Sequence, residues 1–247
     1  MTTLVFLHGV GGGHAAWDRQ VPCLTSLGHR ALAWDQPGYG AAPIVDPYDL
    51  EQVSAALRGL IESMGGEPVV LVGHSMGGFI AQEAYARFPQ WVKALVLGFT
   101  SPAFGGGSRE FVAQFIAARI APLDAGHTMA EVAAKLMPTM RGSKSLPEGL
   151  AHAERIMGAI PPATYRKAVQ LLTTFERRAQ LPAIGVPTLL IAGGDDRVAP
   201  AHVMERMAQK IPGAEFIVLE GCGHLGPMDQ PGPFNEALRG FLERRKL

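Results

Sequence analysis

Cysteine is scarce in this sequence, and long apolar runs are missing. Its 247 residues contain only Cys23 and Cys222, too few for a disulfide framework, and we expect both to be small buried residues. No run of 18 apolar residues occurs, so we expect no membrane-spanning helix. The start, Met1–Leu7, lacks the positive segment and long apolar core of a signal peptide. Together these absences predict a cytoplasmic protein.

An excess of charge of either sign is also missing. The sequence has 22 basic and 22 acidic residues, and no block of like charge occurs. Nucleic acids and anionic membrane surfaces are bound by basic patches, so the composition argues against both as partners. The histidines lack the spacing of a metal site, and the glycines at Gly9–Gly13 do not complete a dinucleotide-binding fingerprint. We therefore expect a small-molecule partner, with no metal and no cofactor.

Short, nearly continuous apolar runs alternate with longer helical patterns along most of the chain. Continuous runs are typical of strands covered on both faces, and the alternation indicates parallel strands with right-handed crossovers. The expected strands are 4–7, 31–34, 69–72, 94–97, 188–192 and 215–219. The expected helices are near 15–27, 49–64, 76–88, 200–211 and 231–245. The sequence therefore predicts an α/β fold with a doubly wound, mostly parallel sheet of about six strands.

The alternation stops between Leu97 and Thr188. Helical patterns near 109–121, 128–140, 148–159 and 163–178, separated by prolines, occupy this stretch. A helical insertion between two strands is expected to cover the carboxyl ends of the sheet. We therefore divide the chain into an α/β core, residues 1–100 and 181–247, and a helical cap, residues 101–180.

A sharp turn is expected at residues 73–77, Gly-His-Ser-Met-Gly, the only G-x-S-x-G pattern in the sequence. The pattern alone is a weak signal, but an apolar strand precedes it and a helix follows it. A serine on such a turn has strained backbone angles, and its Oγ lies at the carboxyl edge of the sheet and at a helix N-terminus. Ser75 is therefore the predicted nucleophile.

A serine nucleophile needs a base with a pKa near 7, and histidine is the usual one. His8 and His74 lie inside glycine turns, and we expect both to be structural. His224 lies in a glycine-rich loop after the last strand, which is on the same sheet edge as Ser75. We predict that His224 accepts the proton of Ser75.

The third member of such a site is a carboxylate that orients the histidine and stabilises its protonated form. The loop after strand 188–192 contains two candidates, Asp195 and Asp196, and the residues themselves leave the choice open. The segment after strand 94–97, residues 98–101, contains no carboxylate. We therefore expect the acid to come from the later loop.

Acyl transfer places negative charge on a carbonyl oxygen, and each N–H donor that stabilises it lowers the barrier by about 3–4 kcal/mol. One donor is expected to be the backbone N–H of Met76, directly after the nucleophile. The second is expected in the glycine-rich turn after the first strand, where we choose the N–H of Val10, with Gly11 as its competitor. Met76 and Val10 form the predicted oxyanion hole.

Together these residues resemble the α/β-hydrolase superfamily over nearly the whole chain. The matching segments are His8-Gly9, the turn at 35–40, the serine turn, Gly193-x-x-Asp196-x-x-x-Pro200 and Gly223-His224. In the superfamily the acid stands four residues before that proline, so the resemblance implies a triad of Ser75, His224 and Asp196. It also implies that Asp35 is structural rather than catalytic.

Members of the superfamily usually begin with two further strands, an antiparallel pair, whereas this sequence starts directly on the strand before His8. We therefore expect strand 31–34 to lie near an edge of the sheet. An uncovered edge strand can pair with a second chain. A monomer and a homodimer are both consistent with this expectation, and light scattering would distinguish them.

Within the superfamily the chain is most similar to small, capped bacterial hydrolases: enol-lactonases, carboxylesterases and meta-cleavage C–C hydrolases. The expected function is hydrolysis of a small carboxylic ester or lactone through an acyl-enzyme. The alternative is C–C bond hydrolysis of a vinylogous diketone, which uses the same triad. A non-hydrolytic or ligand-binding member of the fold is a third reading.

The predicted cap contains apolar side chains that we expect to contribute to the substrate pocket. They are Phe104, Phe111, Phe115, Met137, Met140, Ile156, Met157, Leu171, Leu172 and Phe175. Three arginines of the cap, Arg109, Arg155 and Arg166, are candidates to neutralise a substrate carboxylate, although we expect at least two of them to be solvated.

Overall fold

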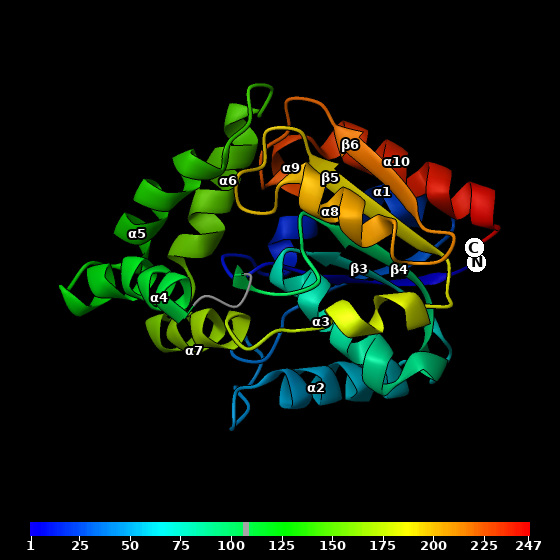
Figure 1. The fold of residues 1–247 in the computed structure, drawn as a ribbon, viewed down its shortest axis with the longest axis horizontal. Coiled ribbons are helices and arrows are strands. Elements are labelled where there is room, and N and C mark those ends of the chain that lie inside the picture. The colour runs from blue at the N-terminus through cyan, green and yellow to red at the C-terminus, as the bar shows by residue number, and fades with distance from the viewer. Residues whose placement is uncertain (106–108) are drawn as a thin grey trace.

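Six parallel strands form one sheet at the centre of the protein (Figure 1), in the order β2-β1-β3-β4-β5-β6. The computed structural model describes residues 1–105 and 109–247. The strands are β1 (Thr3–Leu7), β2 (Arg30–Trp34), β3 (Val69–His74), β4 (Val92–Gly98), β5 (Thr188–Gly193) and β6 (Glu215–Leu219). The predicted α/β fold with its six-stranded sheet is confirmed, and β2 lies at one edge as expected.

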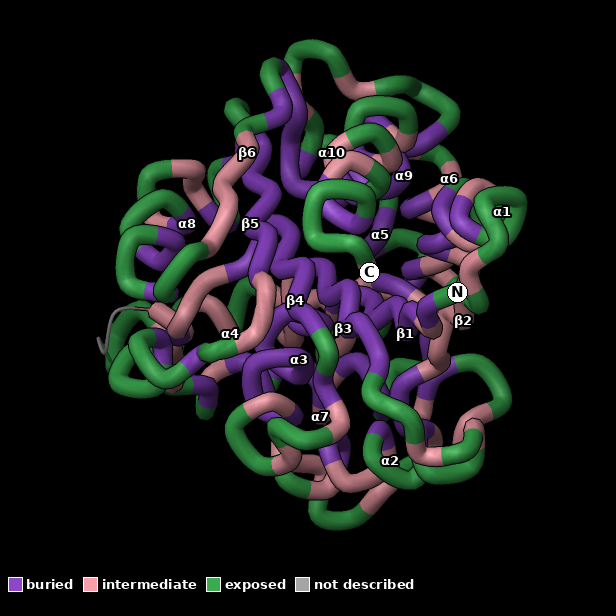
Figure 2. The backbone as a smooth tube through the Cα atoms, turned by 90° about the vertical axis from the view of Figure 1, so that its right-hand side faces the viewer, coloured by how far each residue is buried: buried purple, intermediate pink, exposed green. Residues whose placement is uncertain are grey.

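Helices cover both faces of the sheet. Helices α2 (Leu50–Ser63), α3 (Met76–Arg87) and α8 (Ala201–Ala208) lie on one face, and α1 (Gln20–Ser26) and α10 (Pro231–Arg245) lie on the other (Figure 2). Strands β3 and β5 are therefore buried along their whole length, which explains their continuous apolar sequences. Among the helices of residues 1–105 and 109–247, none combines the length and the apolar character needed to cross a bilayer.

Several short helices complete the core. A 3₁₀ helix at His14–Trp17 precedes α1, so the pattern predicted as one helix near 15–27 is two short helices. A 3₁₀ turn at Pro89–Trp91 leads into β4, another at Arg178–Ala183 precedes β5, and α9 (Gly226–Asp229) precedes α10. The loop between β6 and α9 contains His224 and lies at the carboxyl edge of the sheet.

Four helices form the insertion between β4 and β5, at the left of Figure 1. They are α4 (Arg109–Asp124), α5 (Met129–Leu136), α6 (Pro147–Gly158) and α7 (Pro162–Leu172), with a 3₁₀ turn at Met137–Met140 after α5. Thr128 and Glu131 form a capping box at the start of α5, and a proline occupies the first turn of both α6 and α7. These local signals explain why the helices begin where the sequence predicts.

The prediction of a helix over 163–178 is wrong at its C-terminal end. Helix α7 ends earlier, and the chain then pairs with the segment that leaves β4. The N–H of Phe104 donates to the carbonyl of Phe175 (3.0 Å), and the N–H of Arg177 donates to the carbonyl of Pro102 (2.8 Å). These backbone hydrogen bonds hold the two ends of the insertion together, so tertiary pairing replaces the last helical turn.

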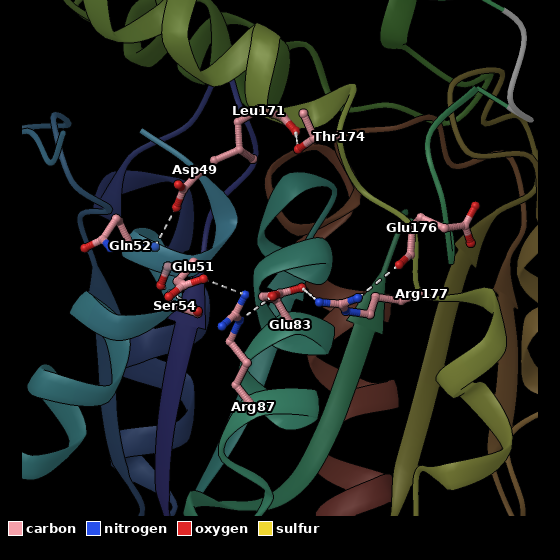
Figure 3. Close-up of polar contacts among 10 residues, drawn as sticks. All are labelled: Asp49, Glu51, Gln52, Ser54, Glu83, Arg87, Leu171, Thr174, Glu176 and Arg177. Atoms are coloured by element: carbon pink, nitrogen blue, oxygen red, sulfur yellow. Dashed lines mark hydrogen bonds and ion pairs between the residues drawn. The ribbon is translucent and has the colours of Figure 1, made fainter. Parts of the chain in front are cut away.

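A buried carboxylate connects helix α3 to the end of the insertion. The side chain of Glu83 is only 2% exposed and pairs with Arg87 (2.5 Å) and with Arg177 (Figure 3). Arg87 also pairs with Glu51 of α2, at 3.2 Å. Because α3 begins at the residue after Ser75, this network ties the helix behind the nucleophile to the base of the insertion.

We expect Glu83→Gln to lower the free energy of unfolding by about 2–4 kcal/mol. Among the described residues, it leaves Arg177 without a carboxylate partner, and Arg87 keeps only its pair with the exposed Glu51. Glu51→Gln is the matched control. The side chain of Glu51 is 61% exposed, so solvent screens its pair with Arg87 and the expected loss is about 0–1 kcal/mol. Urea unfolding of both variants measures the difference. Equal losses would show that the buried network contributes nothing beyond a surface ion pair.

Candidate active site

Ser75 lies on a strained turn between β3 and α3. Its φ of 53° and ψ of −116° place it in a region that residues with a Cβ rarely adopt. The Ser75 N–H donates to the carbonyl of Gly98 (3.0 Å), and the hydroxyl of Thr100 donates to the carbonyl of Ser75 (2.9 Å). A Cβ at Gly77 would overlap the carbonyl of Leu7, so only glycine fits there. The turn therefore holds the serine at the carboxyl edge of the sheet, where the sequence predicts it.

Ser75, His224 and Asp196 form a hydrogen-bonded chain. Nε2 of His224 lies 3.0 Å from Oγ of Ser75, and Nδ1 of His224 lies 2.8 Å from Oδ2 of Asp196. The side chains of His224 and Asp196 are 5% and 0% exposed. A carboxylate that accepts from Nδ1–H leaves Nε2 free to accept the serine proton. The structure thus brings together the three residues that the sequence predicts as a triad.

The surroundings of the two adjacent aspartates differ. Asp196 accepts hydrogen bonds from two backbone N–H groups of its own loop, at 2.7 and 3.0 Å, besides its contact with His224. Burial alone would raise the pKa of Asp196, but the His224 ring and these donors outweigh burial and hold that pKa below its ordinary value. Asp195 is exposed and accepts instead from the N–H and hydroxyl of Ser143. The geometry selects Asp196 as the partner of His224.

Two further histidines hold the loops of the site in place. Nε2 of His74 lies 2.7 Å from the carbonyl oxygen of His224, and Nδ1 of His8 lies 2.8 Å from the carbonyl oxygen of Gly9. Burial, assisted by nearby His224, lowers the pKa of His74 to about 3, and burial lowers the pKa of His8 to about 4. Both rings are therefore neutral at pH 7, and each can donate its single N–H to the carbonyl it contacts. This agrees with the structural role that we expect for both.

Val10 and Gly11, the two candidates for the first oxyanion donor, both line the cavity above Ser75. The carbonyl of Val10 accepts a hydrogen bond from the hydroxyl of Tyr39 (2.9 Å), which fixes the orientation of this turn. Met76 is the first residue of α3, where a backbone N–H has no acceptor within the helix. The oxyanion hole of Val10 and Met76 stays a prediction, with Gly11 as the alternative to Val10.

A cavity of about 480 Å³ lies above Ser75 and His224, between the sheet edge and the insertion. Of the ten apolar residues of the insertion that the sequence singles out, seven line it. They are Phe104, Phe111, Phe115, Met137, Met140, Met157 and Leu172. Ile156, Leu171 and Phe175 pack elsewhere, and Phe175 stacks on Phe79 with ring centroids 4.1 Å apart. The predicted apolar wall is therefore present, built from most of the predicted residues.

The three arginines proposed from the sequence do not line this cavity. Arg109 and Arg155 are exposed, as expected of two of them, and Arg166 pairs with Asp124 at 2.6 Å. Arg119 of α4, which sequence reasoning missed, does line it. Nothing in the sequence pattern separates Arg119 from the other arginines, because its position depends on how α4 packs against α7.

A family model for the alpha/beta hydrolase fold matches residues 2–231. The chain belongs to that family. This α/β hydrolase is 30% identical to a protein of Stutzerimonas stutzeri provisionally named carbamate hydrolase RutD, over 97% of this chain and 91% of that one. It is 27% identical to a 2-hydroxy-6-oxononadienedioate/2-hydroxy-6-oxononatrienedioate hydrolase of a Pseudomonas species, over 98% and 88% of the two chains.

Among solved structures, the α/β hydrolase is similar to a thermophilic esterase from Thermogutta terrifontis, with a TM-score of 0.90 and 25% sequence identity. The match covers 99% of this chain and 90% of that one. The names of these three proteins indicate three different kinds of substrate. The geometry of the site, rather than any one name, therefore has to support a function.

Proposed function

We propose that this α/β hydrolase cleaves a small carboxylic ester or lactone by attack of Ser75 through an acyl-enzyme. The observation that supports this function best is the chain of contacts from Ser75 through His224 to Asp196, at 3.0 and 2.8 Å. The apolar cavity directly above Ser75 suits a small organic acyl or alcohol group. Similarity to an esterase over 99% of the chain agrees with this proposal.

In the proposed reaction, Oγ of Ser75 attacks the carbonyl carbon while Nε2 of His224 accepts the hydroxyl proton. Asp196 stabilises the imidazolium that forms, and the N–H groups of Val10 and Met76 stabilise the oxyanion. His224 then donates its proton to the leaving alkoxide, which departs as the alcohol. His224 next takes a proton from a water molecule, which attacks the acyl-enzyme and releases the acid and free Ser75.

C–C bond hydrolysis of a vinylogous diketone is the alternative. The 27% identity to an oxononadienedioate hydrolase favours it, and the same three side chains would act on a ketone carbonyl. The two functions differ in their leaving group, which is an alkoxide in one and a stabilised carbanion in the other. A member of the fold that binds ligand without turnover is a third possibility, and it predicts no reaction with either substrate.

An alkyl fluorophosphonate tests the proposal, because it forms a covalent adduct only with an activated nucleophile. We expect one adduct per chain, located on Ser75 by peptide mass spectrometry, and a loss of p-nitrophenyl ester hydrolysis in proportion to the labelled fraction. Ester turnover that survives complete labelling would contradict the proposal. Turnover of a vinylogous diketone far above that of every ester and lactone in the panel would favour the alternative.

A further inference from the structure

Arg119 places a cation in the wall of the catalytic cavity without an acidic partner. It lies on α4, and its guanidinium carbon is 3.7 Å from the ring centroid of Phe115, which lines the same cavity. Across residues 1–105 and 109–247, no carboxylate pairs with Arg119. By contrast, Arg166 on the neighbouring helix α7 pairs with Asp124 at 2.6 Å. The insertion thus neutralises one of these arginines and leaves the one in the cavity unpaired.

The guanidinium of Arg119 is partly desolvated, and no anion among the described residues compensates for the lost hydration. Burial lowers the pKa of Arg119 from its usual high value, but a guanidinium stays protonated at neutral pH. A partly desolvated cation without a counter-ion is unfavourable, and an anion that enters the cavity would relieve it. The aromatic face of Phe115 stabilises the cation but provides no hydrogen-bond acceptor.

Tyr165 provides a second unsatisfied donor beside Arg119. Its side chain is fully buried on α7 and lines the same cavity, and its hydroxyl has no hydrogen-bond partner among the described residues. Burial raises the pKa of Tyr165, so the phenol is neutral at pH 7 and can donate. A charged planar donor and a buried hydroxyl donor on two adjacent helices are complementary to the two oxygens of a carboxylate.

We propose that Arg119 and Tyr165 bind an ionised carboxyl group of the substrate. The inference rests on the proposed function and narrows it: the enzyme would hydrolyse esters or lactones that carry a second carboxyl group, remote from the bond that Ser75 attacks. The apolar wall between the sheet edge and α4 would hold the carbon chain that joins the two groups. Arg197 also lines the cavity but is exposed, so solvent screens its charge more strongly.

Two series of paired esters test this inference. In the first, p-nitrophenyl esters of glutarate, adipate and pimelate are compared with neutral esters in which an isopropyl group replaces the carboxylate. In the second, hexanoate esters of hydroxybenzoic acids are compared with the hexanoate esters of the matching hydroxybenzamides. This second series places the charge in the leaving group. We expect kcat/KM in at least one series to be about tenfold or more higher for the anionic member, the usual size of a charge-assisted hydrogen bond.

Substitution of Arg119 separates the binding of charge from the folding of the cap. Arg119→Gln is expected to lower kcat/KM for the preferred anionic ester by about 10- to 100-fold, mainly through KM, because a remote contact binds substrate and transition state alike. Neutral esters are the reference for each variant: their kcat/KM should fall much less than that of the anionic ester, so the ratio of the two measures the loss that is specific to the charge. Arg119→Lys should restore part of the preference, and Tyr165→Phe should reduce it by about 2- to 10-fold. Arg109→Gln, on the exposed side of the same helix, is the matched control and should change neither class.

The outcomes distinguish this inference from the proposed function. If neutral esters are hydrolysed at Ser75 but neither series shows a preference for the anion, the carboxylate site is wrong and the esterase function stands. Equal losses for anionic and neutral esters in Arg119→Gln, with no rescue by lysine, would also overturn it. Binding of heptanoate, measured by calorimetry, tests the site even without turnover: we expect wild type to bind it about tenfold or more tightly than Arg119→Gln, and equal binding would contradict the inference.

Discussion

Replacing Ser75 with alanine is expected to lower kcat for ester hydrolysis by about 10⁴- to 10⁶-fold, because no other group can form the acyl-enzyme. The hydroxyl lies 3.0 Å from Nε2 of His224, and alanine removes it while keeping the Cβ. The positive φ at this position costs alanine no more than serine, so we expect the free energy of unfolding to change by less than about 1 kcal/mol. Steady-state kinetics on the best p-nitrophenyl ester measure the loss.

Ser26→Ala is the control for this substitution. Ser26 is exposed on α1, and its hydroxyl donates to the carbonyl of Cys23, far from the cavity in the fold. Its kcat should match the wild type within about twofold, since surface substitutions rarely affect a distant site. A Ser75→Ala enzyme that keeps more than about 1% of the wild-type kcat would exclude Ser75 as the nucleophile and point to direct attack by water.

The features that the sequence predicts correctly are those set by local backbone geometry. The strand-turn-helix around Ser75 follows from an apolar run, two flanking glycines and a helical pattern, and each of these acts within a few residues. A Cβ at Gly77 would overlap the backbone of β1, so this turn requires glycine at that position, and the glycine in the sequence indicates the turn. The glycines around Ser75 and the order of the strands along the chain thus indicate that Ser75 and His224 lie at the same edge of the sheet.

The features that the sequence misses depend on contacts between distant segments. The end of α7 is set by hydrogen bonds to residues 102–104. The helical pattern over 163–178 does not indicate these hydrogen bonds, because they join segments that are far apart in the sequence. The sequence also predicts the wrong arginines for the cavity, and the reason is the same. Arg109 and Arg119 lie on α4 and Arg166 lies on α7, and only the packing of α4 against α7 decides which one lines the cavity.

The sheet and the insertion differ in what they contribute to the site. The sheet and the loops at its carboxyl edge hold Ser75, His224 and Asp196 together, and a fold of this kind can support several reactions. The insertion supplies most of the apolar wall of the cavity as well as Arg119, so the proposed choice of substrate depends on the insertion rather than on the sheet. The sequence therefore predicts where Ser75 and His224 lie better than it predicts which side chains of the insertion line the cavity.

Replacing Asp196 with asparagine is expected to lower kcat by about 10⁴-fold with little loss of substrate binding, as for the aspartate of other serine–histidine sites. Asparagine has nearly the same shape but can donate an N–H to Nδ1 of His224, which would then act as an acceptor. The ring proton would move to Nε2, so that Nε2 could no longer accept the proton of Ser75. The mutant should therefore keep a KM near that of the wild type.

Asp195→Asn provides a matched control one residue away. Asp195 is exposed and accepts hydrogen bonds from Ser143 rather than from His224, so its replacement should change kcat by less than about threefold. Comparison of kcat for the two variants measures which aspartate orients the histidine. A larger loss in Asp195→Asn than in Asp196→Asn would show that the buried contact at 2.8 Å is not the one that catalysis uses. The opposite order would place the orienting charge on Asp196, where a buried carboxylate fixes the tautomer before any substrate arrives.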